Sequence, residues 1–182
     1  MKRTNKVKIG SAVALIIILG LFFHYNLPRT AVVQISGTDI KRMDKTEKVS
    51  EQQSQTDEKE MMEQRTSDVR FINSMSRDKK TMVFRNEDTG WGWPPYFKFN
   101  SADLTAKAQS FATDQTKSWV LVKYYGWRFS VFSKFPNVLS LKKVDRNYRH
   151  FPLFNIVFLI LFFAFVVFAR IKIKKLISRI RG

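Results

Sequence analysis

The chain has 182 residues, two histidines, no cysteine and a formal net charge of +17. The lack of cysteine excludes a disulfide framework, a thiolate nucleophile and a cysteine-ligated zinc site. Because His24 and His150 lie at the edges of two long apolar runs, the region between the runs has no imidazole for general-base catalysis or metal binding. We therefore expect no metal, no cofactor and no catalytic residue of these types.

The positive charge is concentrated at the two ends of the sequence. Residues 1–8 and 170–182 together carry +10, whereas residues 28–150 contain all fifteen acidic residues. Because these basic ends flank apolar runs, anionic lipid is a nearer polyanion than nucleic acid, and we expect membrane lipid as a partner and no nucleic acid. The residues expected to contact anionic lipid are Lys2, Arg3, Lys6, Lys8, Arg170, Lys172, Lys174 and Lys175.

Residues 9–27 form the first apolar run, which follows a basic segment. This pattern is typical of either a cleaved signal peptide or an uncleaved signal anchor. The run ends in the bulky residues His24 and Tyr25 before Pro28, and no small-residue cleavage site follows. We interpret it as a signal anchor that crosses a membrane, with His24 and Tyr25 in the interfacial layer.

The segment after this run predicts a strand and then a polar insertion. Apolar residues recur over residues 30–42 and are interrupted by Gly37, which indicates a β-strand with a bulge or bend. Residues 45–67 consist mainly of Glu, Gln, Ser, Thr and Lys. Since such a segment buries too little apolar surface to offset its ordering entropy, we predict a mobile insertion.

Four further strands are predicted in the central region. Residues 68–75 and 81–87 fit a β-hairpin joined by a polar turn. Residues 118–125 and 137–144 fit two more strands, the first of them strongly apolar.

One helix is predicted between the hairpin and the last two strands. Ser101 is a suitable N-cap for a helix of about ten residues. Leu104, Ala108 and Phe111 would lie on one face of it. Five strands and one short helix predict a small α+β domain over residues 28–150, with a partly open β-barrel as one arrangement.

An aromatic segment links the hairpin to this helix. Residues 87–99 contain two Trp, one Tyr and two Phe. Gly90 and Gly92 permit backbone geometry that other residues resist, while Pro94 and Pro95 stiffen the chain. The aromatic side chains of such a loop either fill the core of a small domain or form an exposed platform for a sugar ring, a lipid headgroup region or a partner protein.

The candidate binding residues are Trp91, Trp93, Tyr96, Trp127 and Arg128. The first three belong to the aromatic segment. Arg128, which follows Trp127, is a candidate to receive an anionic group.

The second apolar run, residues 151–169, contains no charged residue. Nineteen helical residues extend about 28 Å, close to the roughly 30 Å hydrocarbon core of a bilayer. Pro152 falls in the first turn, where a missing N–H is tolerated, and Arg170 ends the run. We predict a second transmembrane helix, because a helix that is apolar on every face would otherwise need a large soluble core around it.

The distribution of Lys and Arg around the two runs predicts the orientation. These residues occupy 10 of the 21 positions in the two tails, but 9 of the 40 positions in the opposite flanks, residues 28–47 and 131–150. The positive-inside rule therefore places both tails in the cytoplasm and the central domain outside it.

Several strings resemble an uncharacterised family of bacterial inner-membrane proteins, catalogued only as a domain of unknown function. They are residues 85–99, with the string Trp-Gly-Trp-Pro-Pro-Tyr, and residues 101–104, 125–128 and 135–137. The resemblance covers both apolar runs and most of the central domain, but not residues 45–67. It implies a two-span layout in a bacterial inner membrane and supplies no catalytic residue.

Two functional hypotheses follow. The first is a non-enzymatic binding or scaffold module whose extracytoplasmic domain binds an envelope protein or glycan. The second is an envelope enzyme that acts on glycan or lipid with Glu87, Asp88 or Asp103 as the acid. The lack of cysteine, and of histidine away from the apolar runs, favours the first hypothesis.

Overall fold

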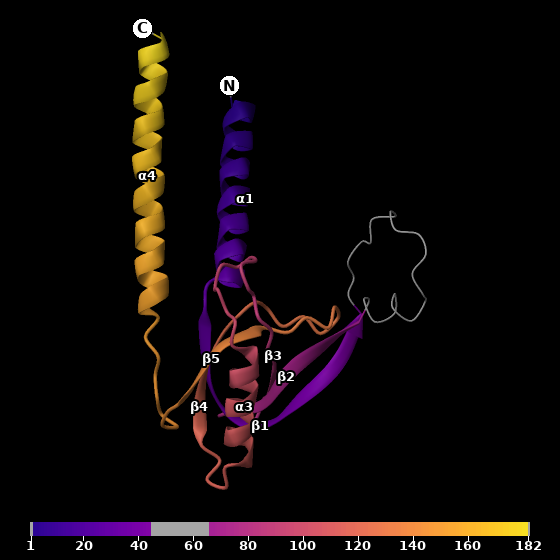
Figure 1. Ribbon diagram of the computed structural model, residues 1–182. Coiled ribbons are helices and arrows are strands. Elements are labelled where there is room, and N and C mark those ends of the chain that lie inside the picture. The colour runs from indigo at the N-terminus through magenta and orange to yellow at the C-terminus, as the bar shows by residue number, and fades with distance from the viewer. Residues whose placement is uncertain (1, 45–65, 182) are drawn as a thin grey trace, which may run out of the picture. The chain divides into compact units, whose positions relative to one another are not determined.

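The computed structural model describes residues 2–44 and 66–181, which contain three helices and five strands (Figure 1). In chain order these are α1 (Lys2–Asn26), β1 (Arg29–Asp44), β2 (Thr66–Ser76), β3 (Thr81–Arg85), α3 (Ser101–Thr113), β4 (Trp119–Tyr125), β5 (Asn137–Lys143) and α4 (Leu153–Arg181). The chain divides into two compact units, residues 1–148 and 149–182. The first unit holds α1, the strands and α3, and the second holds α4.

The five strands form a closed barrel in the order β1-β2-β3-β5-β4. Neighbouring strands are antiparallel, except that β3 and β5 are parallel and share the single pair Arg85–Asn137. The N–H of Arg85 also donates to the carbonyl of Pro136 at 2.8 Å, which closes the seam. The predicted five strands and one helix are confirmed, but the barrel is closed rather than partly open, because this short seam joins strands that are distant in sequence.

β1 pairs with two neighbours along its length. Residues 29–34 pair with β4, and most of the strand pairs with β2. The register shifts between Ile35 and Gly37, which confirms the bulge predicted at Gly37. Since a bulge bends a strand and increases its twist, it lets one strand turn the corner of the barrel.

The predicted polar insertion, residues 45–67, lies outside the described residues except at its end. Thr66 and Ser67 belong to β2, where they pair with Asp44 and Met43. The observed strand therefore starts two residues before the predicted boundary. Ladder hydrogen bonds join backbone groups, so pairing continues into polar residues that carry no apolar pattern.

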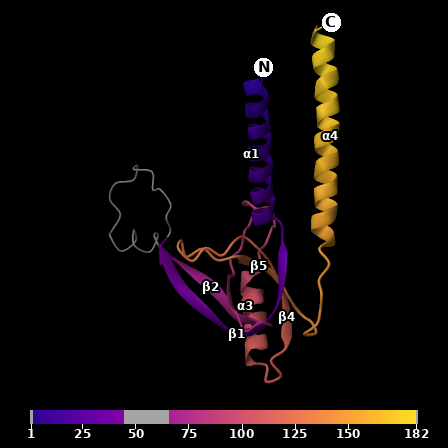
Figure 2. The ribbon, with the colours of Figure 1, turned by 180° about the vertical axis from the view of Figure 1, so that it is seen from behind.

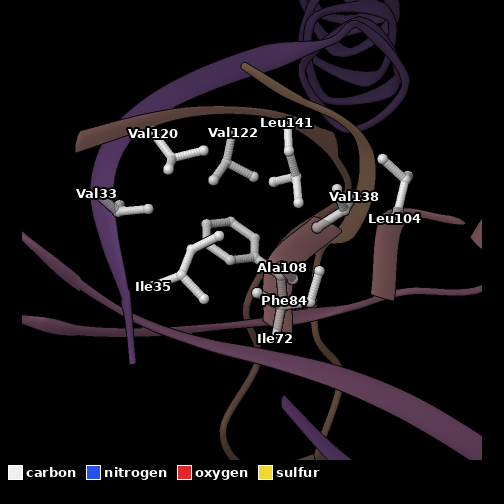
Figure 3. Packing of buried hydrophobic residues seen from close by; sticks show 10 residues of the cluster. All are labelled: Val33, Ile35, Ile72, Phe84, Leu104, Ala108, Val120, Val122, Val138 and Leu141. Atoms are coloured by element: carbon white, nitrogen blue, oxygen red, sulfur yellow. The ribbon is translucent and has the colours of Figure 1, made fainter. Parts of the chain in front are cut away.

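The core of the barrel is a cluster of mostly aliphatic side chains around Phe84 (Figure 3). Leu104 and Ala108 of α3 join this cluster and Phe111 packs against it, which confirms the predicted apolar face of the helix. The buried members are Val33, Ile35, Ile72, Phe84, Leu104, Ala108, Val120, Val122, Val138 and Leu141.

The start of α3 differs from the prediction. Asn100 rather than Ser101 occupies the N-cap position, and it makes no side-chain capping hydrogen bond. The carboxylate of Asp88 instead accepts hydrogen bonds from the backbone N–H and the hydroxyl of Ser101, at 2.9 and 2.7 Å. These bonds satisfy one of the free N–H groups of the first helical turn from a residue outside the helix.

α1 and α4 contain stretches long and apolar enough to cross a membrane, Ile9–Asn26 and Leu153–Arg179. Neither stretch has a residue buried inside the protein, and both helices run without interruption (Figure 2). Pro152 precedes α4 rather than lying in its first turn, and its carbonyl accepts the N–H of Ile156 at 3.2 Å. The helix itself continues past Arg170, where the apolar run ends.

Candidate binding surface where α1 meets the barrel

The end of α1 is joined tightly to one end of the barrel. α1 ends at Asn26 and β1 begins at Arg29, so two residues link them. The last carbonyls of a helix have no partner within it. Here the N–H of Gly126 donates to the carbonyl of Tyr25 at 3.0 Å, and the hydroxyl of Tyr96 donates to the carbonyl of Asn26. Two loops of the barrel thus cap the helix and fix its direction relative to the strands.

Gly126 meets a backbone requirement at this junction. Its φ of 89° lies in the region that favours glycine, and a Cβ at this position would stand 3.6 Å from Pro136 Cα and 3.9 Å from the Tyr25 ring. Its carbonyl accepts a hydrogen bond from the guanidinium of Arg29, the first residue of β1. One residue therefore connects the end of β4 with both α1 and β1.

The loop of residues 90–99, here named the aromatic loop, carries its largest side chains on the outside. Trp91 is 84% exposed and Trp93 is 68% exposed. Trp91 contacts Phe97 and Phe99 edge to face, with ring centroids 5.3 and 5.8 Å apart. The possibility that Trp91, Trp93 and Phe97 form the core is therefore wrong, because all three are exposed and the strands and α3 already fill the barrel.

Trp93 contacts α1 directly. Its ring stacks on that of Phe22 with centroids 5.9 Å apart. Both views place the aromatic loop beside the barrel end of α1 (Figures 1 and 2). The exposed aromatic surface of the loop is therefore continuous with the apolar surface of the helix.

Tyr96 is the candidate residue that faces inward. Its ring lies against that of Tyr125, with centroids 4.9 Å apart, and its hydroxyl caps α1 as described above. Burial raises the pKa of the Tyr96 hydroxyl, so this group remains a neutral hydrogen-bond donor. Tyr96 thus attaches the aromatic loop to both the barrel and α1.

A buried polar network holds the base of the aromatic loop. The ammonium group of Lys98, which is 5% exposed, donates to Asn86 Oδ1 at 2.6 Å. The amide nitrogen of Asn86 donates in turn to the carbonyl of Ser101 and the hydroxyl of Thr105, at 2.7 and 2.9 Å. Burial lowers the pKa of Lys98 to about 8, although the charges of Asp88 and Glu87 oppose this shift.

Sequence reasoning missed Lys98. The string Phe97-Lys98-Phe99 would ordinarily place the phenyl rings inside and the lysine outside. The structure reverses this, since Phe97 and Phe99 are 54% and 58% exposed. An available signal was the position of the lysine between two aromatic residues, ten and eleven residues after the acidic pair Asp88 and Glu87.

The three carboxylates considered as catalytic acids have separate local roles. Asp88 holds the start of α3, and Asp103 lies in the first turn of that helix, where a negative charge is favourable. Glu87 forms an ion pair with Arg85. The described residues contain no group of three or more His, Cys, Asp or Glu placed to hold a metal ion. Each of the three carboxylates thus has a local contact or position in the fold.

The loop of residues 126–136, named the β4–β5 loop, also contacts the last turn of α1. Trp127 donates from Nε1 to His24 Nδ1 at 2.6 Å, and its ring meets that of Tyr25 edge to face. The guanidinium of Arg128 lies 3.9 Å from the centroid of the Phe135 ring and donates to the carbonyl of Lys134 at 3.0 Å. Arg128 therefore contacts its own loop through Nη1 and the face of its guanidinium, and the residue is exposed.

A cavity of about 390 Å³ lies between the β4–β5 loop and the end of α1. The ion pair of Arg85 and Glu87 contributes charge to its wall. Aromatic side chains contribute most of the rest, among them Tyr25, Tyr125 and Trp127. Its wall therefore combines aromatic side chains with one ion pair.

The basic residues predicted to contact lipid lie on the two long helices. Lys2, Arg3, Lys6 and Lys8 belong to the first turns of α1. Their counterparts on α4 are exposed, and the ammonium of Lys172 lies 5.4 Å from the centroid of the Phe168 ring. The exposed residues on α4 are Arg170, Lys172, Lys174 and Lys175.

Comparison with known proteins identifies relatives of the chain. The model of a family described as "protein of unknown function (DUF1523)" matches residues 4–177, which confirms the predicted resemblance. A protein of Haemophilus influenzae strain Rd, described as an uncharacterized protein, is 37% identical over 124 residues, which cover 68% of this chain and 66% of the relative. The chain thus spans slightly less than two thirds of that relative's length. No solved structure matches.

Proposed function

The chain belongs to the DUF1523 family, and we propose that it is a two-span protein of the bacterial inner membrane that acts as a non-enzymatic binding or scaffold module. In this proposal α1 and α4 cross the membrane, both tails lie in the cytoplasm, and the barrel lies outside it. The barrel then presents its aromatic loop at the membrane surface to a component of the cell envelope.

One observation carries this proposal. Trp91 and Trp93 are exposed on a loop that is fastened to the end of an apolar helix, and neither contributes to the core. An exposed Trp has a large apolar surface that water solvates poorly, and rigid aromatic side chains are effective anchors in recognition. The exposed apolar surface of α1 and α4 and the basic residues at their far ends support the membrane layout.

Co-purification tests the proposed binding role. The full-length protein and the double variant Trp91→Ala, Trp93→Ala would be extracted in mild detergent, and all proteins, glycans and lipids retained with each would be identified by mass spectrometry. We expect the unaltered protein to retain a component that the variant loses. The matched control is Asp103→Asn, which removes a carboxylate from the first turn of α3 and leaves the aromatic loop intact. Equal retention by all three proteins would contradict the proposal.

A further inference from the structure

We infer that the aromatic loop contacts the headgroup layer of the bilayer that α1 crosses. Trp91 and Trp93 then anchor the barrel to the membrane surface. The inference rests on the proposed function in one respect, namely that α1 crosses the membrane. The inference names lipid as the ligand of the exposed aromatic loop. The proposed function leaves open which envelope component this loop binds.

The first argument is the position of Trp93 along the axis of α1. Trp93 stacks on Phe22, whereas Tyr96 caps the helix at Asn26. Phe22 and Asn26 are separated by about one helical turn, or roughly 6 Å along the axis. Phe22 lies within the apolar stretch Ile9–Asn26. A bilayer that covers this stretch therefore reaches the Trp93 ring as well.

The rigid junction carries the second step. Capping of the Tyr25 and Asn26 carbonyls by the two loops leaves the barrel little freedom to lift away from the helix end. Trp127 adds a third contact through its hydrogen bond to His24. The aromatic loop therefore has a fixed depth relative to α1, and that depth corresponds to the interfacial layer that Trp and Tyr favour.

The reversed burial pattern of the loop carries the third step. Phe97 and Phe99 are exposed on either side of Lys98, whose charged side chain is buried in the interior. A loop that faces water would place these side chains the other way round, because burying a charged group is costly and burying apolar area is favourable. The arrangement fits a loop whose outside faces an apolar or interfacial environment.

The same geometry disfavours a soluble partner at this surface. A glycan or soluble protein that reached Trp93 would have to enter the lipid layer around Phe22. The headgroup layer already surrounds that position and accepts amphipathic rings without a specific pocket. The position of the loop therefore favours contact with the bilayer over contact with a soluble partner.

Fluorescence quenching by brominated lipid tests the inference on the full chain in liposomes. The test protein keeps Trp93 alone and carries Trp91→Phe, Trp119→Phe and Trp127→Phe. The matched control keeps Trp119 alone. Trp119 begins β4 while Tyr125 ends it beside the α1 junction, so the control residue is roughly 20 Å from the membrane end. A third protein carries Ile16→Trp with all four native Trp replaced by Phe, and it reports on α1.

With lipids brominated high in the acyl chain, we expect Trp93 to lose most of its emission and Trp119 to lose almost none. We expect the Ile16→Trp reporter to be quenched by lipids brominated deep in the chain. If that reporter is quenched while Trp93 responds only to aqueous iodide, the inference is overturned and the membrane span stands. If the reporter itself is unaffected by brominated lipid, both the span and the inference that rests on it fail.

A variant with a single change covers the case in which the multiple Trp replacements prevent folding. The native chain has no cysteine, so Trp91→Cys carries one reactive thiol at a position that is 84% exposed. A spin label attached there is expected to be more accessible to oxygen than to a water-soluble nickel chelate. The control label at Gln115→Cys, in the exposed turn between α3 and β4, is expected to show the opposite. Equal accessibility at the two labels would overturn the inference.

Discussion

Trp91 and Trp93 should differ sharply from Phe84 in what they contribute to stability. The two tryptophans are exposed, so Trp91→Ala and Trp93→Ala are each expected to change the free energy of unfolding by about 0.5 kcal/mol or less. Phe84 is 0% exposed at the centre of the core, and Phe84→Ala is expected to cost about 3–5 kcal/mol. Denaturant unfolding of the three variants in one detergent measures the difference. Destabilisation by either Trp variant as large as that of Phe84→Ala would contradict the exposed placement.

The buried ammonium of Lys98 predicts a pH dependence of stability. Its pKa is lowered from 10.5 to about 8 in the folded protein. Below about pH 8 the group is protonated in both states, and the folded state bears the full cost of burying the charge. Between about pH 8 and 10.5 the unfolded chain binds more protons than the folded chain, so this cost is relieved and stability rises.

The variant Lys98→Met isolates this effect from the other titrating groups. Relative to the variant, the unaltered protein is expected to gain about 3 kcal/mol as the pH rises from 7 to 10.5, since one pKa unit corresponds to about 1.4 kcal/mol. Unfolding curves of both proteins at several pH values measure the gain. A stability difference that does not change with pH would show that the folded protein does not depress the pKa of Lys98.

The location of the aromatic side chains was not predictable from their sequence. A dense aromatic segment is equally consistent with a core and with a surface, because both use large apolar side chains. What decides between them is the contact of Trp93 with Phe22, which lies far away in the chain. Arg128 is a second example, since its guanidinium contacts the Phe135 ring and the carbonyl of Lys134, and the string Trp-Arg does not indicate these contacts.

At the scale of elements, the hairpin of β1 and β2 predicts that the polar segment between them can be shortened. Asp44 and Thr66 are paired partners at the open end of this hairpin. Deletion of residues 48–64 leaves a four-residue loop between them, a length common in hairpins. We expect the variant to accumulate in the membrane and to unfold at nearly the same denaturant concentration as the full chain. Loss of accumulation would show that the deleted segment is needed for folding.

The strands and α3 were predictable because their side chains follow the periods of a strand and a helix. Val120 and Val122 face the core two positions apart, and Leu104 and Ala108 do so four positions apart. The closure of the barrel was not predictable, because it depends on one pair, Arg85 and Asn137, at the ends of strands that are far apart in sequence. Pairing between distant strands leaves no periodic signal in either one.

At the scale of the whole molecule, the membrane layout connects the sequence to the proposed function. In the proposed layout, the unequal distribution of basic residues orients the chain, and the two apolar helices are the spans. The barrel continues directly from α1 through a two-residue link, so this layout requires the barrel to lie on the side of the membrane that Asn26 reaches.

Thiol labelling tests this layout most directly, because the native chain contains no cysteine and each variant has one target. Gln115→Cys places a thiol on an exposed turn of the barrel, and Ser178→Cys places one on the exposed surface of α4 beyond Arg170. Spheroplasts would be treated with a membrane-impermeant maleimide before and after lysis. We predict that Gln115→Cys is labelled in intact spheroplasts and that Ser178→Cys is labelled only after lysis. The reverse pattern, or labelling of both positions before lysis, would contradict a barrel held outside the cytoplasm by two spans.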